Sequence, residues 1–550
     1  MLKSVAMAMP VYVISCFKLP LGIVNEIETL LMNFWWEKGA KKRGIPWIAW
    51  KRLQYAKREG GLGFRDLAKF NDALLAKQVW RIIHYPNSLF ASVMKAQYFK
   101  DVSVLDAQER RYQSYGWSSL LAGRNVIKKG SRFIVGDGNS IRLQQDNIIA
   151  SHLPRPVVLN VPDTNKTIAA LISTTGTYRS WNEDEITRLI SPLDRNHLMN
   201  IYLTRQEISD RLVWHYTPSG DYTVRSGYWL LMHDPTNTKP KMAAPYGSIE
   251  LKNKIWKIPI LPKIKYMLWR TISKALPTCS CLITRGMNFE PTCPRCPNEE
   301  ESINHALFTC PYAHRIWRLL NAPILANHSF TNDPQENISF LVDNFSNKNL
   351  AEEERLMPFW IIWRIWKARN KFVFEKFRQC PLKLVSQLDE EVKEWIRAKR
   401  SSRLNQVVTS SHPTSKRWTK PPSSYVKINF DASFHVNSTA SSGGWVIRDH
   451  NGSAKAWGSS VLEHVTSPLE AETKALLVTM EQTWIRGYTR VLFEGDCEVL
   501  INTINERRSR SDIANLLHDI GFWASKFSSL VFTFTSRKCN SLAHHLASPL

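Results

Sequence analysis

The stretch VKINFDASF, residues 426–434, decides how the last third of the chain folds. Apolar side chains at positions 426, 428 and 430 alternate with the polar Lys427 and Asn429, which is the period of a β-strand. Asp431 stands where this alternation ends. The stretch therefore predicts a strand that presents an acidic side chain at its end.

The sequence after this strand predicts a mixed sheet with helices packed on it. Asn451-Gly452 is a strong hairpin signal, and Pro468 begins an amphipathic helix. The expected strands are 445–448, 454–462, 491–494 and 530–535, and the expected helices are 469–484, 498–506, 512–526 and 541–547. Three antiparallel strands, followed by helices and further strands, indicate an α+β domain with a mixed five-stranded sheet and flanking helices.

Three acids lie in separate blocks of this region: Asp431, Glu472 in SPLEAETKALL and Asp496 in RVLFEGDCEVL. We expect them to converge, and converging carboxylates repel one another unless cations bind between them. Such a cluster suits two Mg²⁺ ions about 3.5–4 Å apart that hold a phosphodiester for in-line hydrolysis. Glu470 is the alternative acid on the helix, but residues two apart on a helix point to different faces.

These blocks resemble, in order and spacing, the type 1 ribonuclease H domain of plant non-LTR retroelements. The matching features are Asp431, the run Ala471-Glu472-Thr473-Lys474-Ala475-Leu476, Asp496, and a last motif of Arg537, Asn540, Ala543, His544, Leu546 and Ala547. The resemblance implies that Asp431, Glu472 and Asp496 hold two Mg²⁺ or Mn²⁺ ions and that His544 assists catalysis. His544 departs from the all-acid form of the motif, and Mg²⁺ prefers oxygen ligands to imidazole. Weaker Mg²⁺ binding, relatively better activity with Mn²⁺, and loss of activity all stay open.

Five of the nine cysteines lie within residues 279–310, which argues for reduced thiols and metal binding, not for a disulfide framework. The pattern Cys293-x2-Cys296-x8-His305-x4-Cys310 predicts a tetrahedral Zn²⁺ site. Four protein ligands leave no open position, so the predicted Zn²⁺ is structural. The alternative is a set of buried free cysteines beside a surface histidine.

The region of the cysteines resembles the zinc-binding domain that follows the polymerase in plant LINE-type reverse transcriptases. The matching stretches are LPT, CPRC and NHALFTC and, nearer the N-terminus, SCFKLP, NFWW, EGGLGFRDL, FNDALLAKQVWR and LFASVMKAQYF. The Tyr-x-Asp-Asp turn of a polymerase does not occur in the 550 residues. The resemblance therefore implies the C-terminal part of such a protein, with the polymerase domain missing.

The net charge of +25, from 73 Lys and Arg against 48 Asp and Glu, indicates a polyanionic partner, most simply nucleic acid. Residues 424–550 hold 12 basic and 12 acidic residues, so the excess lies upstream. Between positions 35 and 58, tryptophans interleave with Lys and Arg. This composition suits a surface that stacks bases along a nucleic acid, or core tryptophans beside a solvated basic face.

Composition and resemblance divide the chain into six expected segments. They are a helical region at 1–100, a strand-rich region at 101–234, a zinc-binding domain at 251–320, a helical connector at 321–400, a basic linker at 401–424 and a ribonuclease H-like domain at 425–550. In finer detail, we expect short strands and turns over 124–143 and 214–231, one helix over 255–270 and a polar loop over 327–349.

The N-terminal apolar run, Val5–Phe17, is interrupted by Pro10 and ended by Lys18 without a small-residue cleavage site, so we expect no signal peptide. No stretch approaches the roughly 20 apolar residues of a membrane span. The expected location is intracellular, in the nucleus or cytoplasm, with no membrane partner.

Three hypotheses about the function, from different classes of protein, fit this sequence. The first is a metal-dependent endoribonuclease that cleaves the RNA strand of RNA–DNA hybrids. The second is a nucleic-acid-binding remnant of a retroelement whose nuclease fold is catalytically weak or dead, which the histidine at position 544 favours. A third is a fragment whose product does little. The first two expect RNA–DNA hybrid or RNA as partner.

Overall fold

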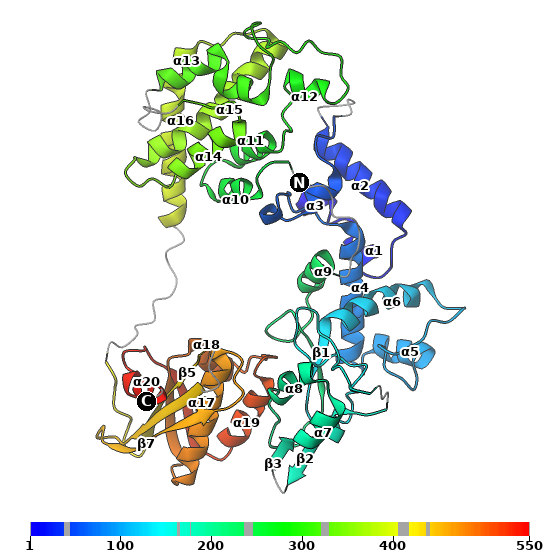
Figure 1. Ribbon diagram of the computed structural model, residues 1–550, viewed down its shortest axis with the longest axis vertical. Helices are drawn as coiled ribbons and strands as arrows, with labels where there is room; N and C mark the ends of the chain where they lie inside the picture. The colour runs from blue at the N-terminus through cyan, green and yellow to red at the C-terminus, as the bar shows by residue number, and fades with distance from the viewer. Residues whose placement is uncertain are drawn as a thin grey trace. The chain divides into compact units, whose positions relative to one another are not determined.

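The structure is a computed structural model that describes residues 2–37, 44–161, 165–175, 178–235, 246–320, 329–404, 417–435 and 441–548 (Figure 1). The chain forms two units: a first unit of residues 1–11, 19–68 and 235–411, and a second unit of residues 12–18, 69–234 and 412–550. Among the helices of the described ranges, none has the length and apolarity to cross a membrane. Residues 405–416 of the expected linker lie outside the described residues.

The first unit is helical. Its helices are α2 (Leu21–Trp36), α3 (Trp50–Gln54), α10 (Ile249–Lys257), α11 (Pro262–Ile272), α12 (Cys279–Ile283), α13 (Pro311–Leu319), α14 (Pro334–Asn344), α15 (Glu352–Glu375) and α16 (Pro381–Leu404). The single helix expected over 255–270 is wrong, because Pro262 begins a new helix at its first position. The polar loop expected over 327–349 is also wrong, since Asp333 caps the start of α14 and Pro334 begins it.

The tryptophans near the start of the chain lie in a core. Trp36, Trp47 and Trp50 are buried with Leu53, and Trp50 stacks on Phe64 with 4.9 Å between the ring centroids. Buried rings cannot stack on bases, so for these three tryptophans the structure has the core arrangement.

The upstream part of the second unit mixes helices with two small sheets. Its elements are α4 (Leu67–His84), α5 (Leu89–Tyr98), α6 (Tyr115–Gly130), β1 (Ser131–Ile134), β2 (Ile172–Thr175), β3 (Tyr178–Trp181), α7 (Glu183–Leu189), α8 (Pro192–Met199), β4 (Arg211–Trp214) and α9 (Val224–His233). β1 pairs with β4 and β2 with β3, both antiparallel. The strands expected at 124–130 and 224–231 are wrong, because these residues belong to α6 and α9, which begin at the capping side chains of Ser114 and Thr223.

The downstream part of the second unit is the predicted sheet domain, drawn in yellow to red in Figure 1. Its elements are β5 (Val426–Ser433), β6 (Ser441–Arg448), β7 (Ala454–Leu462), α17 (Pro468–Ile485), β8 (Arg490–Gly495), α18 (Glu498–Asn505), α19 (Ala514–Ala524), β9 (Ser529–Phe534) and α20 (Ser541–Ala547). The strand order is β7-β6-β5-β8-β9, with β5-β6-β7 antiparallel and β5-β8-β9 parallel. The mixed five-stranded sheet with flanking helices is therefore confirmed.

The two faces of this sheet differ in chemistry. Ile428 and Phe430 enter an apolar core together with residues of α17. On the opposite face, α20 lies so close to β6 that a Cβ on Gly444 would come within 2.3 Å of its backbone. Gly444 pairs with Asp431 across the strands, so α20 lies on the face that carries Asn429 and Asp431. This polar face holds the candidate site.

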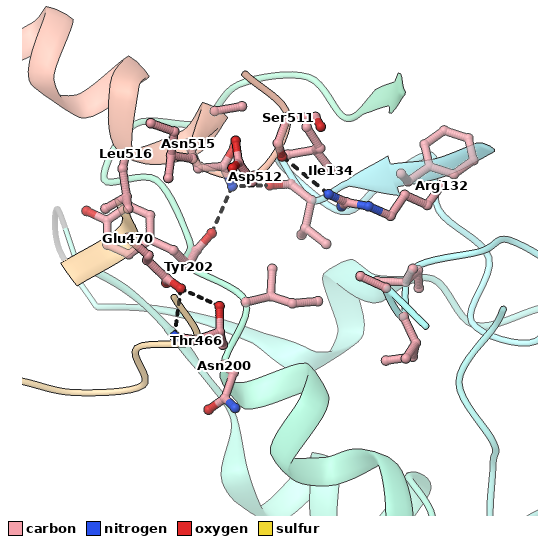
Figure 2. A pocket seen from close by; sticks show the side chains of 18 of the residues that line it. Arg132, Ile134, Asn200, Tyr202, Thr466, Glu470, Ser511, Asp512, Asn515 and Leu516 are labelled. Carbon is pink, nitrogen blue, oxygen red and sulfur yellow. Dashed lines mark hydrogen bonds between the residues drawn. The ribbon is translucent and has the colours of Figure 1, made fainter. Parts of the chain in front are cut away.

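Within the second unit, the upstream part packs against α19 through hydrogen bonds. The Tyr202 hydroxyl donates to Asp519 Oδ2 over 2.7 Å, and the Arg205 backbone N–H donates to the same oxygen over 3.2 Å. The Asn515 amide donates to the carbonyls of Val135 (2.9 Å) and Tyr202 (2.8 Å). A cavity of about 410 Å³ lies at this contact (Figure 2). The sheet domain is thus held by segments that precede it by some 300 residues in the chain.

Candidate metal centres

Three acids meet near the end of β5. Asp431 comes from that strand, Asp496 directly follows the parallel neighbour β8, and Glu472 projects from the first turns of α17. One carboxylate oxygen from each lies within 4.8 Å of the others. The structure therefore brings together the three acids that the sequence singles out.

Burial raises the affinity for protons of two of these carboxyls, those of Glu472 and Asp431. Desolvation, followed by the charges of Asp431 and Asp496, raises the pKa of Glu472 to about 9. Desolvation also raises the pKa of Asp431 to about 6, against the opposing effect of a hydrogen bond from His544. Without a cation, the cluster therefore carries less than its full negative charge near neutral pH.

The donor set fits a hard divalent cation. Oε2 of Glu472 is buried and has no hydrogen-bond partner among the described residues. A buried, unpaired carboxylate oxygen is costly, and a cation held between three carboxylates removes that cost. Carboxylate oxygens are the ligands that Mg²⁺ and Mn²⁺ prefer.

His544 lies beside Asp431 and outside the group of three. Its Nδ1 is 2.7 Å from Asp431 Oδ2, and its Nε2 is 3.1 Å from Nη2 of Arg537. Because arginine can only donate, Nε2 accepts, and this network assigns the proton to Nδ1, which donates to Asp431. Both ring nitrogens thus have side-chain partners, Asp431 on β5 and Arg537 ahead of α20, and both nitrogens lie outside the group of three ligand atoms.

Glu470, the alternative acid on α17, has a different environment. Its Oε2 accepts hydrogen bonds from the backbone N–H (2.9 Å) and the hydroxyl (2.6 Å) of Thr466, and its Oε1 is 3.0 Å from Lys474 Nζ. Figure 2 shows Glu470 and Thr466 at the wall of the cavity between the two parts of the second unit. The lining of that cavity does not include Asp431, Glu472 or Asp496.

Sequence reasoning missed a buried polar group directly beneath the three acids. Lys427, 5% exposed, pairs with Glu494 (Nζ to Oε1, 2.7 Å), and the Asn429 amide donates to the other oxygen of Glu494 over 3.1 Å. The signal was present, since Lys427 and Asn429 interrupt an apolar strand and Glu494 lies two residues before Asp496. The alternation predicts a strand but does not show whether its polar face is covered, and in the structure Lys427 and Asn429 are both buried.

A second cluster lies in the first unit, where Cys293, Cys296, His305 and Cys310 are all buried and place their ligand atoms within 4.8 Å of one another. The Sγ atoms of Cys296 and Cys310 are 3.6 Å apart, close to the separation of about 3.8 Å that two sulfurs have on a tetrahedral Zn²⁺. The three cysteines of the cluster are free thiols. The structure therefore brings together the four residues that the spacing singles out.

The neighbours of this cluster orient its ligands. Nδ1 of His305 lies 2.7 Å from Glu299 Oε2, which leaves Nε2 facing Cys296 at 3.0 Å. A histidine ligand held in this way by a carboxylate is usual at zinc sites. A buried pair of Glu301 and Arg369, with Nε to Oε1 at 2.8 Å, ties the cysteine loop to α15.

Comparison with known proteins matches each cluster to a family. Residues 429–549 match the reverse transcriptase-like family, and they contain Asp431, Glu472, Asp496 and His544. Residues 222–317 match the family described as zinc-binding in reverse transcriptase, and they contain the four residues of the cysteine cluster.

Two relatives from Arabidopsis thaliana extend this result. The chain is 27% identical over 570 residues to a protein named "Putative ribonuclease H protein", a match that covers 99% of this chain and 87% of that protein. It is 39% identical over 151 residues to an uncharacterized mitochondrial protein, covering 27% of this chain and 98% of that protein.

Solved structures of ribonuclease H match about a fifth of the chain. Ribonuclease H1 of Halobacterium salinarum is 21% identical and matches over 22% of this chain and 94% of its own, with a TM-score of 0.21. The N-terminal ribonuclease H domain of a Mycobacterium tuberculosis protein is 20% identical and matches over 22% of this chain and 90% of its own, also with a TM-score of 0.21.

Proposed function

Since the chain belongs to the plant retroelement-type reverse-transcriptase family, in the part that joins a zinc-binding domain to a ribonuclease H-like domain, we propose that it is a metal-dependent endoribonuclease that cleaves the RNA strand of RNA–DNA hybrids. The observation that carries this proposal is the convergence of Asp431, Glu472 and Asp496 around an unpaired buried oxygen.

In this proposal each residue of the site has a defined task. Asp431, Glu472 and Asp496 hold two Mg²⁺ or Mn²⁺ ions. When bound, the ions supply a nucleophilic water at neutral pH and stabilise the charge that develops on the phosphodiester. His544 donates to Asp431 and so fixes which oxygen of Asp431 faces the site. Asp431 is buried and Glu472 and Asp496 are partly buried, so electrostatic interactions at the site are stronger than they would be in bulk water.

We assign the cysteine cluster to a structural Zn²⁺. Three cysteines and a histidine already complete a tetrahedral set, so the site offers no position for a substrate. In the proposal, the first unit and its excess of positive charge bind the nucleic-acid backbone, while the neutral sheet domain carries the chemistry. Nucleic-acid binding and RNA cleavage are both proposed to take place inside the cell, where thiols stay reduced.

The test is a cleavage assay on the full, zinc-loaded chain with a labelled RNA–DNA hybrid and either Mg²⁺ or Mn²⁺. We expect the wild type to cut the RNA strand, and we expect Asp496→Asn to lose at least about a hundredfold in rate, because a metal ligand is lost. Double-stranded RNA and double-stranded DNA of the same sequence serve as substrate controls, and Glu470→Gln serves as the matched variant.

Equal cleavage by the wild type and Asp496→Asn would show that the activity comes from elsewhere. Absence of cleavage with either metal, together with hybrid binding that weakens steeply with salt, would refute the nuclease and leave a nucleic-acid-binding protein.

A further inference from the structure

A tryptophan just upstream of β5, Trp418, covers the buried polar group of Lys427, Asn429 and Glu494. The indole Nε1–H of Trp418 donates to Asn429 Oδ1 over 3.0 Å. The Trp418 ring also lies under two cations, with the Arg448 guanidinium 4.5 Å and Lys427 Nζ 5.3 Å from its centroid. Next to it, the Thr419 carbonyl accepts a hydrogen bond from Lys427 Nζ over 2.7 Å. This short segment, Trp418–Lys420, is called the strap below.

The group that the strap closes connects three elements of the sheet domain. Asn429 of β5 donates to Glu494 of β8 (3.1 Å) and to Oδ1 of Asn540 (3.2 Å), which precedes α20. The side-chain amide of Asn540 in turn donates to the Phe430 carbonyl over 2.8 Å, and its backbone carbonyl accepts the His544 N–H over 3.0 Å in the first turn of α20. The network thus joins the strand of Asp431, the strand that leads to Asp496 and the helix of His544.

The buried amide groups of this network need hydrogen-bond partners, and neighbouring residues provide them. Asn429 and Asn540 are 1% and 0% exposed, so water cannot replace a missing partner. Trp418 Nε1 is the protein donor that the structure gives to Asn429 Oδ1. Without it, the amide would keep a buried acceptor unpaired or turn over, and turning over would break its two donor contacts.

The network lies one strand repeat from the metal ligands. Asn429 precedes Asp431 by two residues, and Glu494 precedes Asp496 by two, so each pair lies on one face of its strand about 7 Å apart. Asn429 and Glu494 are direct partners in the register of β5 and β8. A change in their contact therefore changes the spacing of the two strands where the carboxylates project.

We propose that Trp418 is a positioning residue for the metal site: through Asn429 and Asn540, its indole N–H sets the relative placement of Asp431, Asp496 and His544. This inference rests on the proposed function for its catalytic consequence. It assigns to the strap a part in the active site, although the hydrogen bonds that the described structure gives to the strap go to Asn429 and Lys427 and not to the three acids.

The test separates the N–H group from the ring. Trp418→Phe keeps an aromatic face for Arg448 and Lys427 but removes the donor to Asn429. The matched control is Trp457→Phe on β7, a tryptophan that is 64% exposed. Three quantities are measured on the full, zinc-loaded chain: backbone hydrogen exchange of α20, the Mn²⁺ concentration for half-maximal cleavage, and kcat and KM for an RNA–DNA hybrid.

For Trp418→Phe we expect exchange of the α20 amides about tenfold faster with α19 unchanged, a half-activating Mn²⁺ concentration about tenfold higher and a kcat about tenfold lower at unchanged KM. Trp457→Phe should match the wild type. In an Asn429→Ala background, Trp418→Phe should add little, because the acceptor is already absent.

Three results would overturn the proposal: wild-type exchange and metal requirement in Trp418→Phe, additive effects of Trp418→Phe and Asn429→Ala, or exchange that rises equally in α19 and α20. The last would mean a general loss of stability. Hydrogen exchange is measured with the zinc retained but without Mg²⁺ or Mn²⁺, so it decides the positioning role even if the wild type cuts no substrate. In that case only the proposed function fails.

Discussion

Replacing Glu472 with glutamine should stabilise the metal-free protein, and the gain should grow with pH. Burial and the neighbouring acids raise the pKa of Glu472 to about 9, whereas the unfolded glutamate titrates near 4.5. Between these values the folded state holds a proton that the unfolded chain has released, so the free energy of unfolding falls as pH rises. Glutamine has no proton to release, and the variant therefore lacks this loss.

The size of the stability gain follows from the difference between the pKa values of Glu472 in the folded and the unfolded state. Each pH unit within the gap lowers the free energy of unfolding by at most about 1.4 kcal/mol. The full shift would amount to roughly 3 kcal/mol at pH 7. The Glu472 side chain keeps some exposure, so solvent screens part of the shift. We therefore expect a gain of about 1–2 kcal/mol at pH 7, smaller at pH 6 and larger at pH 8.

The assay is thermal unfolding of the full chain at these pH values, in buffer without Mg²⁺ or Mn²⁺ but with the zinc retained. Glu470→Gln is the control, because Glu470 lies on the same helix but is paired with Lys474 and Thr466. It should lose stability or stay unchanged. Added Mn²⁺ should stabilise the wild type and leave Glu472→Gln unaffected, since the variant lacks a metal ligand.

The reasoning would be refuted by a variant less stable than the wild type at pH 8. A stability difference that does not vary with pH would refute it as well. Either result would mean that the Glu472 carboxylate is ionised and paired in the metal-free fold, so that no cation is needed to neutralise the cluster.

Three other predictions concern metal binding and the packing of the second unit. Mn²⁺ affinity should rise about tenfold or more from pH 6 to pH 8, because binding displaces the Glu472 proton. Calorimetry in two buffers of different ionisation enthalpy would measure the proton released on binding. An affinity that does not change with pH would contradict the release. Cys310→Ser should lose the bound zinc and unfold the cysteine loop, as seen by metal analysis and limited proteolysis, whereas full zinc content would remove it from the ligand set. Tyr202→Phe should lower the free energy of unfolding of the second unit by about 1–2 kcal/mol, measured by thermal unfolding, because the buried Asp519 loses a hydrogen-bond donor. A variant as stable as the wild type would show that this hydrogen bond contributes nothing to stability.

The sheet domain was predictable because its sequence is locally consistent. The alternation at β5, the Asn451-Gly452 turn and Pro468 each gave an element that the structure contains, with ends that differ by a few residues. Upstream, short apolar runs were ambiguous. Val126 and Ile127 fit either a strand or the buried side of a helix, and the capping Ser114 that favours α6 lies twelve residues before Val126.

The candidate site was predictable only in its acids. Asp431, Glu472 and Asp496 have a motif around them, so their meeting could be expected before the structure. The partners beneath them have none, because the contact of Asn429 with Glu494 depends on the register of two parallel strands. The role of His544 was left open by the sequence for the same reason: whether imidazole faces a metal or a carboxylate is decided by its position on α20, 2.7 Å from Asp431.

The contacts of the sheet domain also decide how its chemistry must be studied. A fragment beginning at Ser423 would contain all three acids but lack Trp418, and it would lack the Tyr202 hydroxyl and Arg205 N–H that satisfy the buried Asp519. The fragment would lose these hydrogen bonds, each of which contributes about 0.5–3 kcal/mol, a large share of the stability of a small domain. An inactive fragment would therefore report the loss of these partners and not the capacity of the carboxylates, so only the full chain provides a test of the metal site.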